Sequence, residues 1–366
     1  MKIAQIAPLY ESVPPTCYGG TERVVSYLTE ELVRQGHDVT LFASGDSETQ
    51  ARLVAGCHHA LRLDPNCQVP LAHHIVLLDQ VFQQADAFDV LHFHIDYLHF
   101  PLLPHYFTPT LTTLHGRLDI PDLIPLYQAF PKVPVVSISQ AQRAPLPWLN
   151  WQGTVYHGLP EALYTFRETP GDYLAFLGRI SPEKRVDRAI EIAKRVGMPL
   201  KIAAKVDPAD RAYFESTIEP LFQDPWVDYI GEIGERDKDR FLGQAYALLF
   251  PIDWPEPFGL VMTEALACGT PVIAFRHGSV PEIIDDSDTG FIVSNVDEAV
   301  QAVERVPRVS RSRCRQVFEE RFAVSRMAQD YLRIYKTMVK KRASHALPDD
   351  VLAPQDILRK VPIGAF

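Results

Sequence analysis

The fold is indicated most directly by residues 173–204, which run YLAFLGRISPEKRVDRAIEIAKRVGMPLKIAA. Tyr173–Leu177 is a short apolar run that predicts a buried strand, and Val186–Val196 has apolar residues at helical spacing on one face. Leu200–Ala204 is a second apolar run of strand length. A strand, a helix and a strand in this order predict a βαβ unit with two parallel strands.

The same alternation extends in both directions along the chain. Later strands are expected at Val227–Ile230, Ala247–Phe250, Pro271–Phe275 and Gly290–Val293. Earlier strands are expected at Ile3–Pro8, Val39–Ala43, Val90–Phe93, Leu111–Leu114, Val133–Ser137 and Thr154–His157. Helical patterns fill the intervals, so the predicted fold class is α/β, with parallel sheets covered by helices on both faces.

The length of 366 residues suits two domains of ordinary size. A segment rich in Gly, Pro and charge at 158–172 interrupts the alternation. The predicted organisation is a first domain at 1–160, a linker at 161–172, a second domain at 173–322, a C-terminal helix at 323–342 and a tail at 343–366. Two doubly wound domains joined in this way face a central cleft, and such sheets bind ligands beyond the carboxyl ends of their strands.

Composition excludes several classes of function. A net charge of −10 argues against a nucleic-acid binder, which needs a basic surface. Residues 1–150 carry eight Lys and Arg against fourteen Asp and Glu, which disfavours a membrane-surface acceptor. The N-terminus lacks a signal-peptide core, and the longest uncharged run, 97–116, contains three prolines, so a cytoplasmic protein is expected. The five cysteines have neither metal-ligand nor redox spacing.

The strongest motif is EPFGLVMTEALACGTP at 256–271. A loop with prolines and a glycine opens a helix near Leu260, and the backbone N–H groups at Gly259–Val261 suit an anion. Glu256 precedes this helix and Glu264 lies inside it, where carboxylates can accept hydrogen bonds from sugar and ribose hydroxyls. The alternative is a capped helix with two surface glutamates.

Two shorter motifs point to the same kind of ligand. Gly178-Arg179 and Lys184 follow the strand at 173–177, and two fixed cations there can neutralise a diphosphate without a metal. Gly19-Gly20 precede the first helix and permit a close backbone approach to a ligand. The alternatives are a surface turn and an ordinary loop, and a Gly-x-Gly-x-x-Gly dinucleotide fingerprint is absent.

Together these segments resemble the retaining glycosyltransferases of family four, which have the two-domain GT-B fold. The resemblance covers roughly residues 1–339 and rests on the Glu-x₇-Glu pair Glu256 and Glu264. The Gly-Arg-x₄-Lys pattern at 178–184, the early glycine pair and HGSVPE at 277–282 support it. Two departures are His157, where relatives often have an asparagine, and Trp254 before the motif.

The resemblance implies roles for individual residues. The catalytic residues implied are Arg179, Lys184, Glu256 and His115. The donor-binding residues implied are Gly19, Gly20, Gly178, Glu232, Ile233, Phe258, Gly259, Leu260, Val261 and Glu264. Of these, Arg179 and Lys184 would hold the diphosphate, Glu256 the transferred sugar and Glu264 the ribose. His115 would lie near the reacting carbon, although a purely structural histidine is the alternative there.

The implied reaction transfers a hexose from a nucleotide diphosphate sugar, with UDP-glucose the commonest donor in the family, to a hydroxyl acceptor. No cofactor and no metal are expected, although His92 and His94 on one strand face suggest a metal at first sight. Aromatic residues between His92 and Tyr127 would suit a flat or apolar acceptor unless they belong to the core. A small molecule or soluble glycan is the preferred acceptor, and the sequence indicates no oligomeric state.

Three rival functions remain open at this stage. A sugar-nucleotide epimerase of the same fold would need acid and base carboxylates flanking the sugar. A nucleotide-sugar-binding protein without catalysis would have no reason to keep Arg179 and Lys184. A two-lobed solute-binding protein would need a signal peptide.

Overall fold

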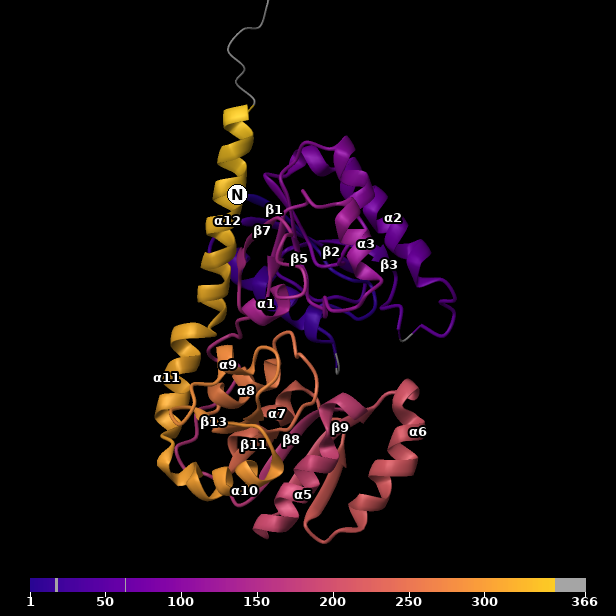
Figure 1. Ribbon diagram of the computed structural model, residues 1–366. Coiled ribbons are helices and arrows are strands. Elements are labelled where there is room, and N and C mark those ends of the chain that lie inside the picture. Colours follow the sequence, from indigo (N-terminus) through magenta and orange to yellow (C-terminus); the bar gives the residue numbers. More distant parts are fainter. Residues whose placement is uncertain (17–18, 63, 346–366) are drawn as a thin grey trace, which may run out of the picture.

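The computed structural model describes residues 1–16, 19–62 and 64–345. Two α/β domains are stacked, with the first domain above the second in Figure 1. Within the described residues the first domain holds a seven-stranded sheet and the second a six-stranded sheet. The strand pairs within both sheets are parallel. The predicted α/β class with two Rossmann-like domains is therefore confirmed.

The first sheet has the strand order β3-β2-β1-β4-β5-β6-β7. Its strands are β1 (Lys2–Ile6), β2 (Asp38–Ser44), β3 (Arg52–Cys57), β4 (Val90–Phe93), β5 (Thr110–Thr113), β6 (Val135–Ser137) and β7 (Trp151–Thr154). The helices of this domain are α1 (Gly20–Arg34), α2 (Pro70–Gln83), α3 (Leu123–Ala129) and α4 (Gln140–Arg143). The strand order reverses between β1 and β4, and the loops that follow these two strands open a crevice for a ligand.

The second sheet has the order β10-β9-β8-β11-β12-β13. Its strands are β8 (Leu174–Ile180), β9 (Leu200–Val206), β10 (Val227–Gly231), β11 (Ala247–Phe250), β12 (Val272–Phe275) and β13 (Gly290–Val293). Its helices are α5 (Val186–Val196), α6 (Arg211–Tyr213), α7 (Glu235–Gly243), α8 (Leu260–Ala267), α9 (Val280–Ile283), α10 (Val296–Arg305) and α11 (Arg311–Arg321). The reversal lies between β8 and β11, so the two strongest sequence motifs follow the two strands at the switch point.

Two details of the first domain differ from the sequence prediction. The strand predicted at Thr154–His157 is wrong, because β7 ends at Thr154 opposite Ser137, the last residue of β6. The Val155 N–H still donates to the Ser137 carbonyl at 2.9 Å, but beyond it the partner strand has ended. The strand β3 was not predicted; it is an edge strand whose residues are only half-buried or exposed.

The C-terminal helix returns to the first domain. The chain passes into the second domain near Leu159, and the Val324 N–H donates to the Leu159 carbonyl at 2.8 Å where the chain comes back. From there α12 (Val324–His345) runs along the first domain (Figure 1), and its residues Tyr331 and Tyr335 join the core that contains Ile3. The helix extends past the predicted end at 342, and the remainder of the predicted tail, residues 346–366, lies outside the described residues.

Polar contacts between side chains and backbone groups also join the two domains. Arg23 of α1 pairs with Glu235 of α7, and both side chains are largely buried. The Glu282 carboxylate of α9 accepts the backbone N–H groups of Gln140 and Ala141 at 2.7 Å each, at the N-terminus of α4. Among the described residues, no helix is both long enough and apolar enough to cross a membrane.

Candidate active site

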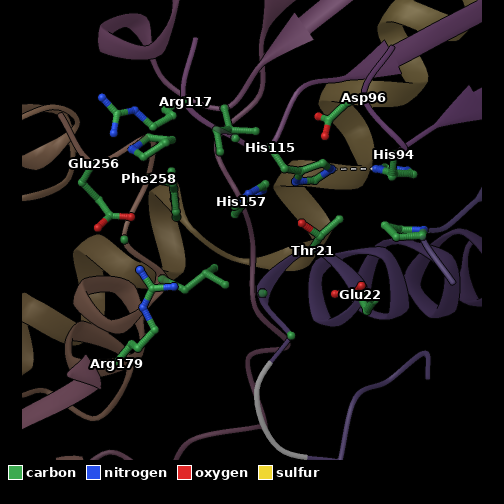
Figure 2. Close-up of a pocket in the computed structure, with 18 of the residues that line it drawn as sticks. Thr21, Glu22, His94, Asp96, His115, Arg117, His157, Arg179, Glu256 and Phe258 are labelled. Atoms are coloured by element: carbon green, nitrogen blue, oxygen red, sulfur yellow. Dashed lines mark hydrogen bonds between the residues drawn. The ribbon is translucent and has the colours of Figure 1, made fainter. Parts of the chain in front are cut away.

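A cavity of about 700 Å³ lies between the two domains (Figure 2). The first domain lines it with the loops after β1, β4 and β5, and the second with the end of β8 and the loop between β11 and α8. A smaller cavity of about 160 Å³ adjoins it. The residues that line both are Gly19, Gly20, Leu177, Gly178, Leu260 and Val261.

The fold brings every predicted site residue to one of these cavities. The larger cavity is lined by Gly19, Gly20, His115, Gly178, Arg179, Lys184, Glu256, Phe258, Gly259, Leu260 and Val261. The smaller cavity adds Glu232, Ile233 and Glu264. A ligand that spans both cavities would touch residues from both domains, while the role of each residue stays a prediction.

The loop before α8 is shaped by two glycines in the left-handed region. Gly259 has φ of 78°, and a Cβ there would come within 3.1 Å of the Phe250 ring. Gly278 has φ of 52°, and a Cβ there would lie 2.3 Å from the Glu256 carbonyl oxygen. The Ser279 N–H donates to this carbonyl at 3.0 Å. The loop at 277–282 therefore packs against the backbone of Glu256 and holds its carbonyl group in place.

The predicted cations are already held by carboxylates. Lys184 Nζ pairs with the Glu256 carboxylate and lies 5.0 Å from the centre of the Trp254 ring. The Trp254 indole N–H donates to Glu256 Oε2 at 3.1 Å. Arg179 donates to Glu183 at 2.5 Å and lies 3.4 Å from an Asp210 oxygen. This wall presents a preorganised pair of positive charges at the carboxyl edge of the sheet.

Glu264 lies in the smaller cavity and has a cation partner that the sequence did not reveal. Its side chain is 3% exposed, and Glu264 Oε1 accepts a hydrogen bond from Lys238 Nζ at 3.0 Å. Lys238 also lies 3.9 Å from Glu235, the partner of Arg23 across the cleft. No motif spacing links these residues, because Arg23 belongs to the other domain.

On the first-domain side, His115 stands at the end of a buried hydrogen-bond chain. His115 Nε2 lies 2.9 Å from His94 Nδ1, and His94 Nε2 lies 2.8 Å from Gln5 Oε1. The Gln5 amide donates to the Tyr335 hydroxyl at 3.2 Å, and that hydroxyl lies 2.7 Å from His92 Nδ1. Gln5 Oε1 can only accept, so His94 donates from Nε2 and accepts at Nδ1. His115 therefore carries its proton on Nε2 and has a lone pair on Nδ1.

Burial keeps these imidazoles neutral. Desolvation lowers the pKa of His115 to about 3 and lowers the pKa of His94 well below its usual range. The His115 ring stacks on His157, with centroids 5.3 Å apart, and His157 meets Phe258 edge-on at 4.8 Å. Within the described residues the Nδ1 atoms of His115 and His157 are buried without a hydrogen-bond partner. Neighbouring protein atoms cover both nitrogens, so each has almost no accessible surface.

The histidines on β4 have structural partners. His92 Nε2 lies 2.8 Å from the Thr113 hydroxyl, so both ring nitrogens of His92 and both of His94 take part in hydrogen bonds. In the described parts of the chain, no group of three or more His, Cys, Asp or Glu residues is arranged to hold a metal ion.

Comparison with known proteins gives the family. Residues 18–160 match the model of glycosyltransferase family 4, and residues 166–321 match the model of glycosyl transferases group 1. The chain belongs to the family 4 glycosyltransferases. This membership confirms the resemblance predicted from the motifs and establishes the chain as an enzyme of the glycosyltransferase class.

Individual relatives of this glycosyltransferase are distant. N-acetyl-alpha-D-glucosaminyl L-malate synthase of Bacillus anthracis is 25% identical over 89% of the chain and 96% of that protein. A 41.2 kDa protein from the cps region of Klebsiella pneumoniae is 28% identical, over 45% of the chain and 46% of that protein. The structure of Anabaena Alr3699/HepE in complex with UDP and glucose has a TM-score of 0.70 at 18% identity, covering 92% of the chain and 100% of that protein. The last match shows a shared fold.

Several residues of the glycosyltransferase cleft were not predicted from sequence. The larger cavity is also lined by Tyr10, Glu22, Arg62, Asp96, Arg117, His157 and Trp254. The sequence singled out His157 and Trp254 only as departures from the family pattern. Glu22 lies in the first turn of α1, directly after the predicted glycine pair, and the other four come from separate loops of the first domain.

The aromatic residues considered for an acceptor lining mostly do not line the cavity, and several belong to the core, which is the alternative that the sequence left open. Phe93, Phe100 and Tyr127 are buried in the core with exposed fractions of 1% or less. Phe107 is 86% exposed, and Tyr106 stacks on Phe82, with ring centroids 4.2 Å apart. Of the aromatic residues considered for this role, Tyr97 lines the cavity. The first-domain wall is therefore polar, with buried ionisable groups.

Proposed function

We propose that this glycosyltransferase moves a hexose, glucose, from a nucleotide diphosphate sugar, UDP-glucose, to a hydroxyl group of a small molecule or a soluble glycan. The transfer retains the anomeric configuration and needs no metal ion. The observation that carries the proposal is the grouping of Arg179, Lys184 and Glu256 around one cavity at the N-terminus of α8, with Glu264 in the adjoining cavity. Cations in the middle and carboxylates on both sides suit a diphosphate between two sugars.

The chemistry follows from this arrangement. The bond between the anomeric carbon and a diphosphate oxygen breaks, and a bond to the acceptor oxygen forms on the same face of the sugar. The acceptor proton passes to the departing diphosphate oxygen. Arg179, Lys184 and the backbone N–H groups at 259–261 stabilise the negative charge that develops on the leaving group. We expect the diphosphate to draw Lys184 away from Glu256, so that Glu256 can accept hydrogen bonds from sugar hydroxyls.

His115 takes a neutral part in this scheme. A pKa of about 3 leaves its imidazole uncharged at neutral pH and makes it too weak a base to take the acceptor proton. Its Nδ1 atom is buried without a hydrogen-bond partner among the described residues, and we expect it to accept a hydrogen bond from a hydroxyl of the transferred sugar once the donor is bound. His115 therefore orients the sugar and does not move a proton.

The choice of UDP-glucose draws on the relatives. The Anabaena structure with the same fold contains UDP and glucose. We place the base and ribose of such a donor in the smaller cavity, which Glu232 and Ile233 line.

The test is a thermal-shift and donor-hydrolysis screen of the purified chain against UDP-, GDP- and ADP-sugars, with the free nucleotides as controls. The proposal expects stabilisation by UDP and UDP-glucose, with slow release of UDP from UDP-glucose. Stabilisation by another base series would correct the donor and leave the transferase assignment intact. Absence of a response to every nucleotide and nucleotide sugar would contradict the proposed site.

A further inference from the structure

The first-domain wall of the cleft has an unusual distribution of charge. The loop after β1, the loop after β3 and the loop after β4 bring Tyr10, Arg62 and Asp96 to the larger cavity, and the first turn of α1 brings Glu22. In the view of Figure 2, Asp96 lies above His115 and Glu22 lies below it. These residues face the position that the donor motifs leave open, where an acceptor must enter.

The two arginines on this wall are already bound by protein carboxylates. Arg62 Nη1 lies 3.0 Å from Glu11 Oε1, and the Glu11 side chain is 6% exposed. Arg117 forms a two-pronged pair with Asp119, at 2.7 Å from Nε and 2.8 Å from Nη2. The positive charge of each arginine is therefore partly offset by a carboxylate of the protein.

Two carboxyl groups on the same wall lack a partner of opposite charge among the described residues. Among the described residues, neither Glu22 nor Asp96 forms an ion pair with a Lys or Arg side chain. Glu22 is 6% exposed, and desolvation raises its pKa to about 7. Asp96 is exposed, sits in the left-handed region with φ of 51°, and accepts a hydrogen bond from the backbone N–H of His115. Each carboxyl group therefore gains from a ligand that donates hydrogen bonds.

From this arrangement we infer that the acceptor is a hydroxyl-rich ring compound without an anionic group, a sugar or a cyclitol, whose hydroxyls donate to Glu22 and Asp96. Tyr10, which is 41% exposed, offers a ring face for stacking such a compound. The inference rests on the proposed function and deepens it by naming the acceptor class. A phosphorylated or carboxylated acceptor would place its negative charge beside the carboxyl groups of Glu22 and Asp96, and we expect it to react at least ~100-fold less efficiently.

The experiment uses the full chain with the donor identified by the screen above. Matched acceptors are glucose against glucose 6-phosphate, methyl glucoside against glucuronic acid, and myo-inositol against its phosphate, with L-malate as a further anion. The inference expects kcat/KM to favour the neutral member of a pair by ~100-fold or more. Equal or better transfer to the anionic member would overturn it, as would transfer to neither class by an enzyme that hydrolyses its donor. Failure to bind any nucleotide sugar would instead overturn the proposed function.

Variants of Glu22 locate the effect on this wall. Glu22→Lys should shift the preference between neutral and anionic acceptors by ~10-fold or more toward the anion, because it replaces the unmatched carboxyl with a cation. The ratio is measured within one preparation, so it does not depend on the fraction that is folded. The matched control is Glu48→Gln, an exposed carboxylate of the same domain, which should keep the wild-type ratio. An unchanged ratio in Glu22→Lys would contradict the inference.

Discussion

The two walls of the cleft differ in the charged groups that they present. The second-domain wall presents Arg179 and Lys184 beside the N-terminus of α8, and its carboxylates Glu256 and Glu264 each pair with a lysine. The first-domain wall presents imidazoles that burial keeps neutral, together with the carboxyl groups of Glu22 and Asp96, which form no ion pair with Lys or Arg among the described residues. In the proposed function the second-domain wall stabilises the leaving group, and the first-domain wall binds the sugar and the acceptor through hydrogen bonds.

The largest effect is expected when a cation is removed from the second-domain wall, which tests whether that wall stabilises the leaving group. We expect Lys184→Ala or Arg179→Ala to lower kcat/KM about 100- to 1,000-fold, or about 3–4 kcal/mol of transition-state stabilisation, because the leaving group loses a fixed positive charge. Steady-state kinetics with the preferred donor measure this. Lys194→Ala is the control, since that lysine is 67% exposed and pairs with Asp224. A loss below threefold, or strong inhibition of the wild type by EDTA, would contradict the metal-free scheme.

The next effect belongs to the first-domain wall and concerns stability. The pKa of Glu22 is about 7 in the folded chain against 4.5 for an ordinary glutamate, so ionising Glu22 costs folding free energy above pH 7 and nothing below pH 4.5. Glu22→Gln removes this cost. We expect the variant to be more stable than the wild type by about 3 kcal/mol at pH 8, with the difference vanishing near pH 4.5.

Urea unfolding at a series of pH values measures this difference, with Glu48→Gln as the exposed control. A constant difference between Glu22→Gln and the wild type from pH 4.5 to pH 8 would show that Glu22 is not desolvated in the folded chain.

A smaller effect is expected from the helix behind the first-domain wall. Tyr335→Phe removes the hydroxyl between Gln5 and His92, so the chain of hydrogen bonds no longer fixes which nitrogen of His115 carries the proton. We expect about a tenfold lower kcat and a loss of about 1–2 kcal/mol of folding free energy. Nitrogen-15 NMR of the histidines should show His115 protonated on Nε2 in the wild type and a mixture in the variant.

Tyr106→Phe is the control for Tyr335→Phe, because Tyr106 is 39% exposed and lies outside this chain. Protonation of His115 on Nδ1 in the wild type would reverse the direction of the hydrogen-bond chain and contradict the proposed role of the lone pair.

The smallest expected effect sharpens the role of Trp254. Trp254→Phe keeps an aromatic ring near Lys184 but removes the indole N–H that donates to Glu256. We expect a three- to tenfold loss in kcat/KM, about 1 kcal/mol, since one hydrogen bond to a charged group is lost. The loss should appear in kcat/KM for the donor and not in the KM for the acceptor. An effect confined to the acceptor would place Trp254 on the other side of the reaction.

The site residues of the second domain could be predicted from the sequence because they lie close together along the chain. Gly178 and Lys184 follow one strand, and Glu256 and Glu264 flank one helix, so strand and helix periodicity already bring them to one sheet edge. The strands at Val90–Phe93, Ala247–Phe250 and Gly290–Val293 were predicted with their observed bounds, and they are largely buried. The edge strand β3, whose residues are half-buried or exposed, was missed.

By itself, the sequence determined the α/β alternation, the two domains, the glycosyltransferase class and the cationic wall, all of which depend on local spacing. Only the tertiary structure decided that Arg23 pairs with Glu235, that Tyr335 is linked to His115 through Gln5 and His94, and that Glu22 is buried without an ion pair to the described Lys and Arg residues. Gln5 and Tyr335 are 330 positions apart, and their contact exists because α12 packs back on the first domain. Such contacts follow from how whole elements pack. The periodicity of a helix or strand shows which of its faces is apolar, but it does not show which other element packs against that face.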